Sequence, residues 1–294
     1  MNYYTEIKNK LIDNINYKKI KDYSKNKNDL KTYYNVGKLL SEAGKFYGEN
    51  IIKKYSIKLT KELGKGYTYT ALFRMRKFYN LYSKLATVSQ LLTWSHYIEL
   101  LKINNVYEIN YYIKISEKQN LSVRELRNKI KSKEYERLDK KTKYKLINKN
   151  KENIQDFIKN PILIKNKFNK ENISEKMLQQ LILEDIPSFL NELGSGFSFI
   201  KNEFKIKLGN TYNYIDLLLY NYIYNCFCVI ELKVTELKKE HIGQIEAYMS
   251  YIDKNIKNIN QNNTIGIIIC KKDNIFIMEY VNNKNIIDKE YKLI

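Results

Sequence analysis

Two acidic residues and a lysine fall at the ends of neighbouring apolar runs in the second half of this 294-residue sequence. Asp216 belongs to the alternating run 212–216, whose period of two predicts a strand with two tyrosines and Asp216 on one face. Glu231 and Lys233 end the next run, which is otherwise apolar, as in a buried strand. Their spacing places both side chains on one face. If the two strands pair through the turn at 220–225, Asp216 lies beside Glu231.

A buried acid pair beside a lysine is unfavourable unless the acids hold a cation. Two carboxylates can bind Mg²⁺, which keeps several waters and takes further ligands from substrate phosphates. Lys233 could orient or deprotonate the attacking water and stabilise the developing negative charge. These groups meet the requirements for hydrolysing a phosphodiester. The alternative is a strand-end salt bridge between Glu231 and Lys233 with a solvated Asp216. The apolar strand, the upstream aspartate and Gln244 on the following helix favour the metal site.

Several longer segments resemble the YhcG-type branch of the PD-(D/E)XK nuclease superfamily, namely ELGSGFSFI, YIDLLLY, VIELKVTELKKEHIGQ and IGIIICK. Three earlier segments, TYTALFRMRKFY, LTWSHYIELLKI and NLSVRELRNKI, resemble the N-terminal domain that accompanies these nucleases. The resemblance implies that Asp216 and Glu231 hold Mg²⁺, for which Mn²⁺ can substitute. It also implies that Lys233 is catalytic and that Gln244 completes the site.

The sequence departs from the family pattern on the helix expected to begin near Ser174. The family usually carries a glutamate there, whereas the matching position holds Gln179. Gln179 could support a metal-bound water, or Glu175, one turn earlier, could substitute for the missing acid. Pro187 should kink or split the same helix. Both departures bear on how this helix contributes to the site.

The positive charge is concentrated in the first half of the chain. Residues 1–150 contain 33 Lys and Arg against 14 Asp and Glu, whereas residues 151–294 contain 19 against 18. A net charge of +19 in the first half predicts a polyanionic partner, with nucleic acid ahead of an acidic membrane surface. Within this half, Thr68 can cap a third helix with Arg74, Arg76 and Lys77 on its polar side. These four residues are the predicted DNA contacts, and a solvated basic helix face is the alternative.

The sequence therefore predicts two domains, a basic all-α, helix-turn-helix-like domain over 1–145 and an α/β domain over 146–294. The first should contain helices over 30–40, stopped by Gly44, and over 49–62, with a polar linker or fraying helix over 131–153. The resemblance implies that the second domain has a restriction-endonuclease-like fold with a mixed four- to five-stranded sheet. We expect its elements to be a helix from 174 to about 193, strands at 197–207, 211–220 and 226–234, a helix at 240–252, and strands at 265–270 and 275–281.

These observations favour a metal-dependent endonuclease that cuts DNA, and the resemblance implies a role in phage defence or in DNA processing and recombination. RNA remains open as a substrate. Two alternatives are a nuclease fold that binds DNA without cutting it and a subunit of a restriction-type complex. A homodimer would supply two sites for cutting both strands. The sequence has neither a signal peptide at its start nor an apolar run long enough to span a membrane, so we expect a cytoplasmic protein. The three cysteines should be buried free thiols.

Overall fold

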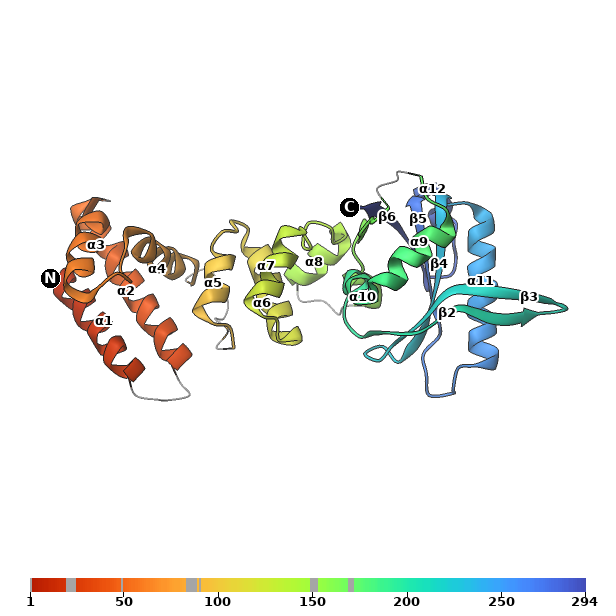
Figure 1. The fold of residues 1–294 in the computed structure, drawn as a ribbon, viewed down its shortest axis with the longest axis horizontal. Helices are drawn as coiled ribbons and strands as arrows, with labels where there is room; N and C mark the ends of the chain where they lie inside the picture. Colours follow the sequence, from red (N-terminus) through yellow and green to blue (C-terminus); the bar gives the residue numbers. More distant parts are fainter. Residues whose placement is uncertain are drawn as a thin grey trace. The chain divides into compact units, whose positions relative to one another are not determined.

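The computed structural model describes residues 2–19, 25–48, 50–82, 89, 91–148, 153–168 and 172–294. They form two compact units, Met1–Tyr135 and Glu136–Ile294. The first unit is helical, and the second holds a sheet flanked by helices (Figure 1). The units meet earlier in the chain than the predicted boundary at 145. Within these described ranges, each helix is too short or too polar to cross a membrane.

The first unit is built from helices of moderate length around an apolar core. Residues spaced at helical intervals on α1, α2, α3 and α4 form this core, among them Ile7, Leu40, Leu59 and Leu72, all with no exposed surface. The described helices are α1 (Tyr3–Lys19), α2 (Lys25–Tyr47), α3 (Asn50–Leu63), α4 (Tyr69–Tyr82), α5 (Trp94–Leu100), α6 (Val106–Gln119) and α7 (Val123–Lys131).

Two predicted boundaries in this unit had different outcomes. The predicted stop at Gly44 is wrong, because α2 continues to Tyr47. A glycine inside a helix is unfavourable by about 1 kcal/mol, but burial of the neighbouring Ala43 on the core face offsets this penalty. The predicted cap at Thr68 is confirmed, since its hydroxyl accepts a hydrogen bond from the Ala71 backbone N–H at the start of α4.

The predicted linker over 131–153 contains an ordered helix, α8 (Lys140–Asn148), in its described part. This helix is fixed by the buried carboxylate of Asp156, which follows in the 3₁₀ helix η1 (Ile154–Phe157). Asp156 accepts hydrogen bonds from Thr142 Oγ1 at 3.2 Å and from Lys145 Nζ at 2.9 Å. The prediction for this segment was a polar linker or a fraying helix, and α8 corresponds to the helical alternative. Its lysine-rich sequence has little apolar periodicity, so the contacts with Asp156 could not be read from the pattern. Residues 149–152 of the predicted linker lie outside the described residues.

The second unit contains a six-stranded mixed sheet in the order β1-β6-β5-β4-β3-β2, so the prediction of four to five strands was too low. The antiparallel strands β2, β3 and β4 follow one another through tight turns, and β4, β5, β6 and β1 pair in parallel. The strands are β1 (Ile162–Ile164), β2 (Phe197–Leu208), β3 (Thr211–Asn221), β4 (Cys226–Glu236), β5 (Ile265–Lys272) and β6 (Ile286–Leu293).

The last predicted strand, 275–281, is instead occupied by the short helix α12 (Ile275–Glu279). Asn274 caps this helix by accepting a hydrogen bond from the Ile277 N–H, a local bond that competes with extended structure. The strand β6, which lies between β1 and β5, was missed because half of its residues are polar or charged. One of these, Lys289, is buried and pairs with Asp139 at 2.9 Å.

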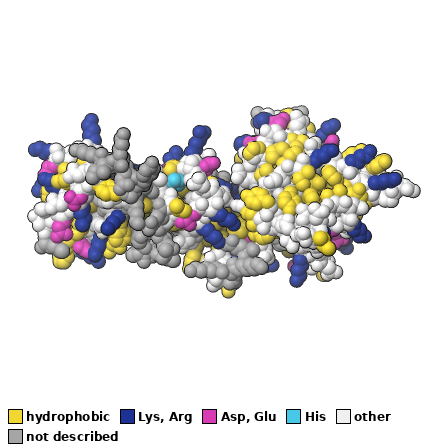
Figure 2. Space-filling view, turned by 90° about the horizontal axis from the view of Figure 1, so that it is seen from below, with side chains coloured by type: hydrophobic (Ala, Val, Ile, Leu, Met, Phe, Trp, Pro, Cys, Tyr) yellow, Lys and Arg dark blue, Asp and Glu magenta, His cyan; other side chains and the backbone are white. Residues whose placement is uncertain are grey.

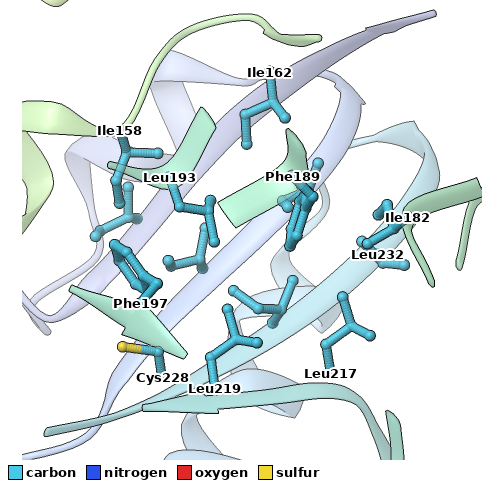
Figure 3. Packing of buried hydrophobic residues seen from close by; sticks show 14 of the residues in the cluster. Ile158, Ile162, Ile182, Phe189, Leu193, Phe197, Leu217, Leu219, Cys228 and Leu232 are labelled. Carbon is cyan, nitrogen blue, oxygen red and sulfur yellow. The ribbon is translucent and has the colours of Figure 1, made fainter. Parts of the chain in front are cut away.

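Two buried clusters cover the two faces of the sheet. On one face, strand residues pack against α9 (Glu175–Glu184) and α10 (Ile186–Leu193), as Figure 3 shows for Phe189, Leu193 and Leu219. On the other face, strand residues pack against α11 (Lys239–Asn255). The helix split predicted at Pro187 is confirmed, because α9 ends and α10 begins around Asp185, with Pro187 in the first turn of α10. All three cysteines are free and buried, as predicted.

Candidate active site

Strands β3 and β4 bring Asp216 and Glu231 together. Their register pairs Leu217 with Ile230, so Asp216 and Glu231 occupy the next opposed positions. A hydrogen bond of 2.7 Å from the Leu232 backbone N–H to Asp216 Oδ2 closes the two strands at this point. The predicted proximity of the two acids is therefore confirmed.

The predicted alternation of β3 does not persist through Asp216. Ile215 and Leu218 both belong to the buried cluster beneath α11, whereas Leu217 belongs to the cluster beneath α9 and α10. Two residues separated by three positions cannot share a face of a regular strand. The strand therefore twists locally at Asp216, a position where its regular pairing with β4 has just ended. Twisting at this point directs the Asp216 carboxylate to the end of β4.

Glu231 has one satisfied and one unsatisfied carboxylate oxygen. The residue is 2% exposed. Its Oε1 accepts hydrogen bonds from Lys233 Nζ and from Gln244 Nε2, both at 2.9 Å. Its Oε2 is buried and has no hydrogen-bond partner within the described part of the chain. A buried oxygen without a partner is unfavourable by about 1–3 kcal/mol or more when charged, so this atom requires an additional ligand.

The electrostatics of the acid pair point to the same need. Burial raises the pKa of Glu231 to about 7, and the negative charge of Asp216 acts in the same direction against the opposing effect of Lys233. Burial also raises the pKa of Asp216, although the Leu232 N–H and Lys233 partly counteract it. Both acids therefore resist ionisation in the metal-free protein. A divalent cation between them would remove this resistance.

Lys233 remains a cation in this site. Burial lowers the pKa of its ammonium, but attraction to Glu231, Glu175 and Asp216 outweighs burial, so the pKa is raised. Its Nζ lies 2.9 Å from Glu231 and 3.8 Å from Glu175. A protonated lysine can donate hydrogen bonds to developing negative charge but cannot accept a proton from water. This environment therefore favours the stabilising role of Lys233 over a role as base.

Gln244 is positioned by α11, whose apolar side packs on the sheet. Lys238 is the N-cap residue of this helix, and its backbone N–H donates to His241 Nδ1 at 3.1 Å. From the second turn, the Gln244 amide donates to Glu231 and also to Tyr248 Oη at 3.0 Å. Tyr248 is buried next to the site, and no role in the site was predicted for it from the sequence. Its spacing of one helical turn after Gln244 was the signal that could have revealed it.

The helix α9 supports the site through Gln179 and Glu175. The buried Gln179 amide donates a 3.0 Å hydrogen bond to the backbone carbonyl of Asp216. Gln179 thus holds the main chain of β3 where the strand twists. Glu175, with 45% of its side chain exposed, lies at the helix N-terminus and reaches Lys233. The sequence-predicted residues Asp216, Glu231, Lys233, Gln244, Gln179 and Glu175 are therefore gathered in one region of the second unit.

The four predicted DNA contacts lie in the first unit and differ in how far their side chains are exposed to solvent. Arg74 is exposed on α4, and Arg76 is half-buried. The Lys77 ammonium donates to the backbone carbonyl of Leu101, which anchors α4 to the segment after α5. Thr68 caps α4. Of the four, Arg74 is the side chain best exposed for a phosphate, while Thr68 and Lys77 have evident structural roles.

The carboxylates of Asp216 and Glu231 suit a hard cation that takes its remaining ligands from water and from a substrate phosphate. Among the residues that the structure describes, no three His, Cys, Asp or Glu side chains group as a metal site. Mg²⁺ commonly binds through one or two carboxylates and completes its shell with water and phosphate oxygens. The pair Asp216 and Glu231, with the unsatisfied Oε2, fits that donor set.

Comparison with known families agrees with this geometry. Residues 155–293 match the family described as the YhcG PDDEXK nuclease domain, and residues 8–137 match the DUF1016 N-terminal domain. The chain belongs to the YhcG-type nuclease family. The site residues of the second unit lie within the nuclease match, and the basic helix α4 lies within the N-terminal match.

One curated relative and several solved structures are also similar to the chain. A candidate nuclease, YhcG, from Escherichia coli (strain K12) is 23% identical over 283 residues, covering 81% of this chain and 76% of the relative. A repair endonuclease from Pyrococcus abyssi has 17% identity and a TM-score of 0.30, covering 42% of this chain and 48% of its own. EndoMS in a complex with double-stranded DNA has 15% identity and a TM-score of 0.31, with the same coverages. The chain thus spans about half the length of these solved structures.

Proposed function

We propose that this protein is a metal-dependent endonuclease that hydrolyses DNA phosphodiester bonds. The observation that carries the proposal is the buried, unsatisfied Oε2 of Glu231 beside the carboxylate of Asp216. Asp216 and Glu231 would hold Mg²⁺, or Mn²⁺ in its place. When bound, the cation would supply a Lewis acid and a more acidic water at the scissile phosphate.

The protein side chains then have separate roles. Lys233 donates hydrogen bonds to the negative charge that develops on the phosphate oxygens. Gln244 holds Glu231 through Oε1 and so keeps Oε2 directed away from its own amide. Gln179 holds the backbone of Asp216, which accounts for an amide where the family usually has an acid. The departures at Gln179 and Pro187 would be the sequence support for an inactive nuclease fold, and this hydrogen bond gives Gln179 a structural role instead.

The first unit would supply affinity for the DNA backbone. Its excess of lysine and arginine gives a broad positive charge, and exposed residues such as Arg74 are available for phosphates. Each phosphate that the protein neutralises releases counterions, so binding should weaken steeply with salt. Cutting both strands of a duplex takes two sites, and a homodimer would provide them.

The proposal is tested by cleavage of supercoiled, linear and branched DNA with Mg²⁺, with Mn²⁺, and with a chelator. Wild type is compared with Asp216→Ala and Lys233→Ala, and DNA binding is followed in parallel. The expected result is cleavage by the wild type in either metal and binding without cleavage by both variants. Preference for branched DNA would support a role in DNA processing. A wild type that binds DNA but leaves all three forms intact in both metals contradicts the proposal.

A further inference from the structure

The hairpin of β2 and β3 carries four exposed side chains, two lysines on β2 and two tyrosines opposite them on β3. The ladder pairs Lys205 with Tyr214 and Lys207 with Tyr212. Tyr212 is 59% exposed and Tyr214 is 52% exposed, and both lysines are exposed. Opposed residues of an antiparallel pair share a face, and the 3.9 Å contact of Lys205 Nζ with the Tyr212 ring confirms this. We refer to these four residues as the Lys–Tyr ladder.

The other face of the hairpin explains why the Lys–Tyr ladder points outward. Phe204, Ile206, Leu208 and Ile215 alternate with the ladder residues and pack into the cluster beneath α11. The hairpin is thereby held in a fixed orientation against a helix of the same unit. At the right-hand end of Figure 2, where the hairpin lies in Figure 1, dark-blue side chains border hydrophobic surface. Aromatic rings kept in solvent beside cations suit a partner that offers both flat faces and negative charge.

The Lys–Tyr ladder ends next to the acid pair of the site. Continuing the register by one position places Glu203 opposite Asp216. Tyr214 precedes Asp216 by two residues, which corresponds to about 6.8 Å along an antiparallel strand. A polymer that enters the site at Asp216 can therefore lie along the hairpin, and its phosphates can meet Lys205 and Lys207.

From this placement we propose that the Lys–Tyr ladder binds a single-stranded segment of nucleic acid next to the scissile phosphate. The inference rests on the proposed function and names its substrate class, namely DNA with an unpaired segment beside the cut. Tyr212 and Tyr214 stack on bases, and Lys205 and Lys207 contact phosphates. Their repeat of about 6.8 Å is twice the spacing of about 3.4 Å between nucleotides along one strand of a duplex. Bases stacked in a duplex have no free faces for the rings, whereas unstacked bases do.

The test measures binding of the full chain by fluorescence anisotropy in chelator, so that no substrate is cut. The probes are a blunt duplex, the same duplex with a single-stranded arm, and the isolated strand. The variants are Tyr212→Ala with Tyr214→Ala and, to keep the rings, Tyr212→Phe with Tyr214→Phe. Tyr222→Ala is the matched control, because Tyr222 is 66% exposed in the turn after β3.

We expect the paired alanine changes to weaken binding of both single-stranded probes by about 5- to 150-fold for each stack lost. The blunt duplex should bind as before, and the phenylalanine pair and Tyr222→Ala should bind as wild type. Lys205→Ala with Lys207→Ala should lower the salt dependence on the single strand by about 0.7 per lost phosphate contact. Lys254→Ala, which removes an exposed lysine at the end of α11, should leave that slope unchanged.

Unchanged binding of the armed duplex in the alanine pair, or an equal loss on the blunt duplex, overturns the inference. The proposed function fails on a different observation, the absence of cleavage by the wild type with Mg²⁺ or Mn²⁺. If the wild type cuts but the ladder variants retain its preference for the armed duplex, the inference alone is wrong. If the ladder binds the single strand as expected but no DNA is cut, the ladder assignment stands as a binding site and the nuclease proposal is wrong.

Discussion

Replacing Glu231 by glutamine should make the metal-free protein more stable at neutral and alkaline pH. Glutamine resembles the protonated carboxyl group and keeps an oxygen that can accept from Lys233 and Gln244. The native carboxyl group, by contrast, ionises at neutral pH although Glu231 is only 2% exposed and lies beside the acid Asp216, and both conditions disfavour the charged form. Removing a charged partner of a lysine usually destabilises a protein, so this prediction has the opposite sign from the ordinary expectation for an ion pair.

The magnitude follows from the pKa of Glu231, which is raised from its ordinary value of 4.5 to about 7, first by burial and then by Asp216. At about 1.36 kcal/mol per pKa unit, the difference corresponds to about 3 kcal/mol. Because the folded pKa is the higher one, this contribution to stability is fully present below pH 4.5 and is lost as the pH rises through 7. The advantage of Glu231→Gln should therefore grow between those limits and level off above them.

Hydrogen exchange of the β4 amides in chelator measures this stability locally. Fluorescence of the single tryptophan, Trp94, would not, because it lies in the other unit. Asp253→Asn provides a control, since Asp253 accepts hydrogen bonds from Thr264 and lies away from the acid pair. Adding Mg²⁺ should then reverse the order, because only the wild type can gain stability by binding the cation. A variant that is less stable than the wild type at pH 8 in chelator would refute the electrostatic reasoning.

Three further changes test other parts of the structure. Gln244→Ala should lower metal affinity by about 10- to 100-fold, because it removes the amide that orients Glu231. Calorimetric titration with Mn²⁺ measures this affinity, and an unchanged value would contradict the role of Gln244. Asp156→Ala should abolish hydrogen-exchange protection of α8, since it leaves a lysine and a threonine without their shared acceptor. Retained protection would contradict the anchoring role of Asp156. Gly37→Ala should lower the free energy of unfolding of the first unit by about 1–3 kcal/mol, measured by denaturant titration, because its Cβ would lie 2.2 Å from the Met75 carbonyl oxygen. Gly66→Ala is the matched control, because a Cβ at Gly66 would meet open space. Equal effects of the two changes would contradict close helix packing at Gly37.

The sequence was informative wherever a local pattern determined the structure. Alternation located β3, a continuous apolar run located β4, and two-residue spacing correctly joined Glu231 to Lys233. Pro187 marked the division between α9 and α10 because proline favours the first turn of a helix. The identities of the acid pair and of Gln244 came from the same patterns combined with the family resemblance.

The remaining features depend on contacts between distant residues. The charged strand β6 exists because its neighbours supply pairing and because Asp139 neutralises buried Lys289. The role of Gln179 could not be predicted, since its partner is a backbone carbonyl on another element. The unsatisfied oxygen of Glu231 is likewise visible only when every neighbouring donor has been placed.

The most direct test of the central claim is the single-turnover rate of DNA cleavage by Lys233→Ala in saturating Mg²⁺, with DNA affinity measured on the same preparation. Lys239→Ala, an exposed lysine at the start of α11, serves as the control. We expect Lys233→Ala to cut about 10²- to 10³-fold more slowly than the wild type while binding DNA equally well. The control should cut at the wild-type rate. Equal rates for Lys233→Ala and the wild type would contradict the assignment of this site as the nuclease centre.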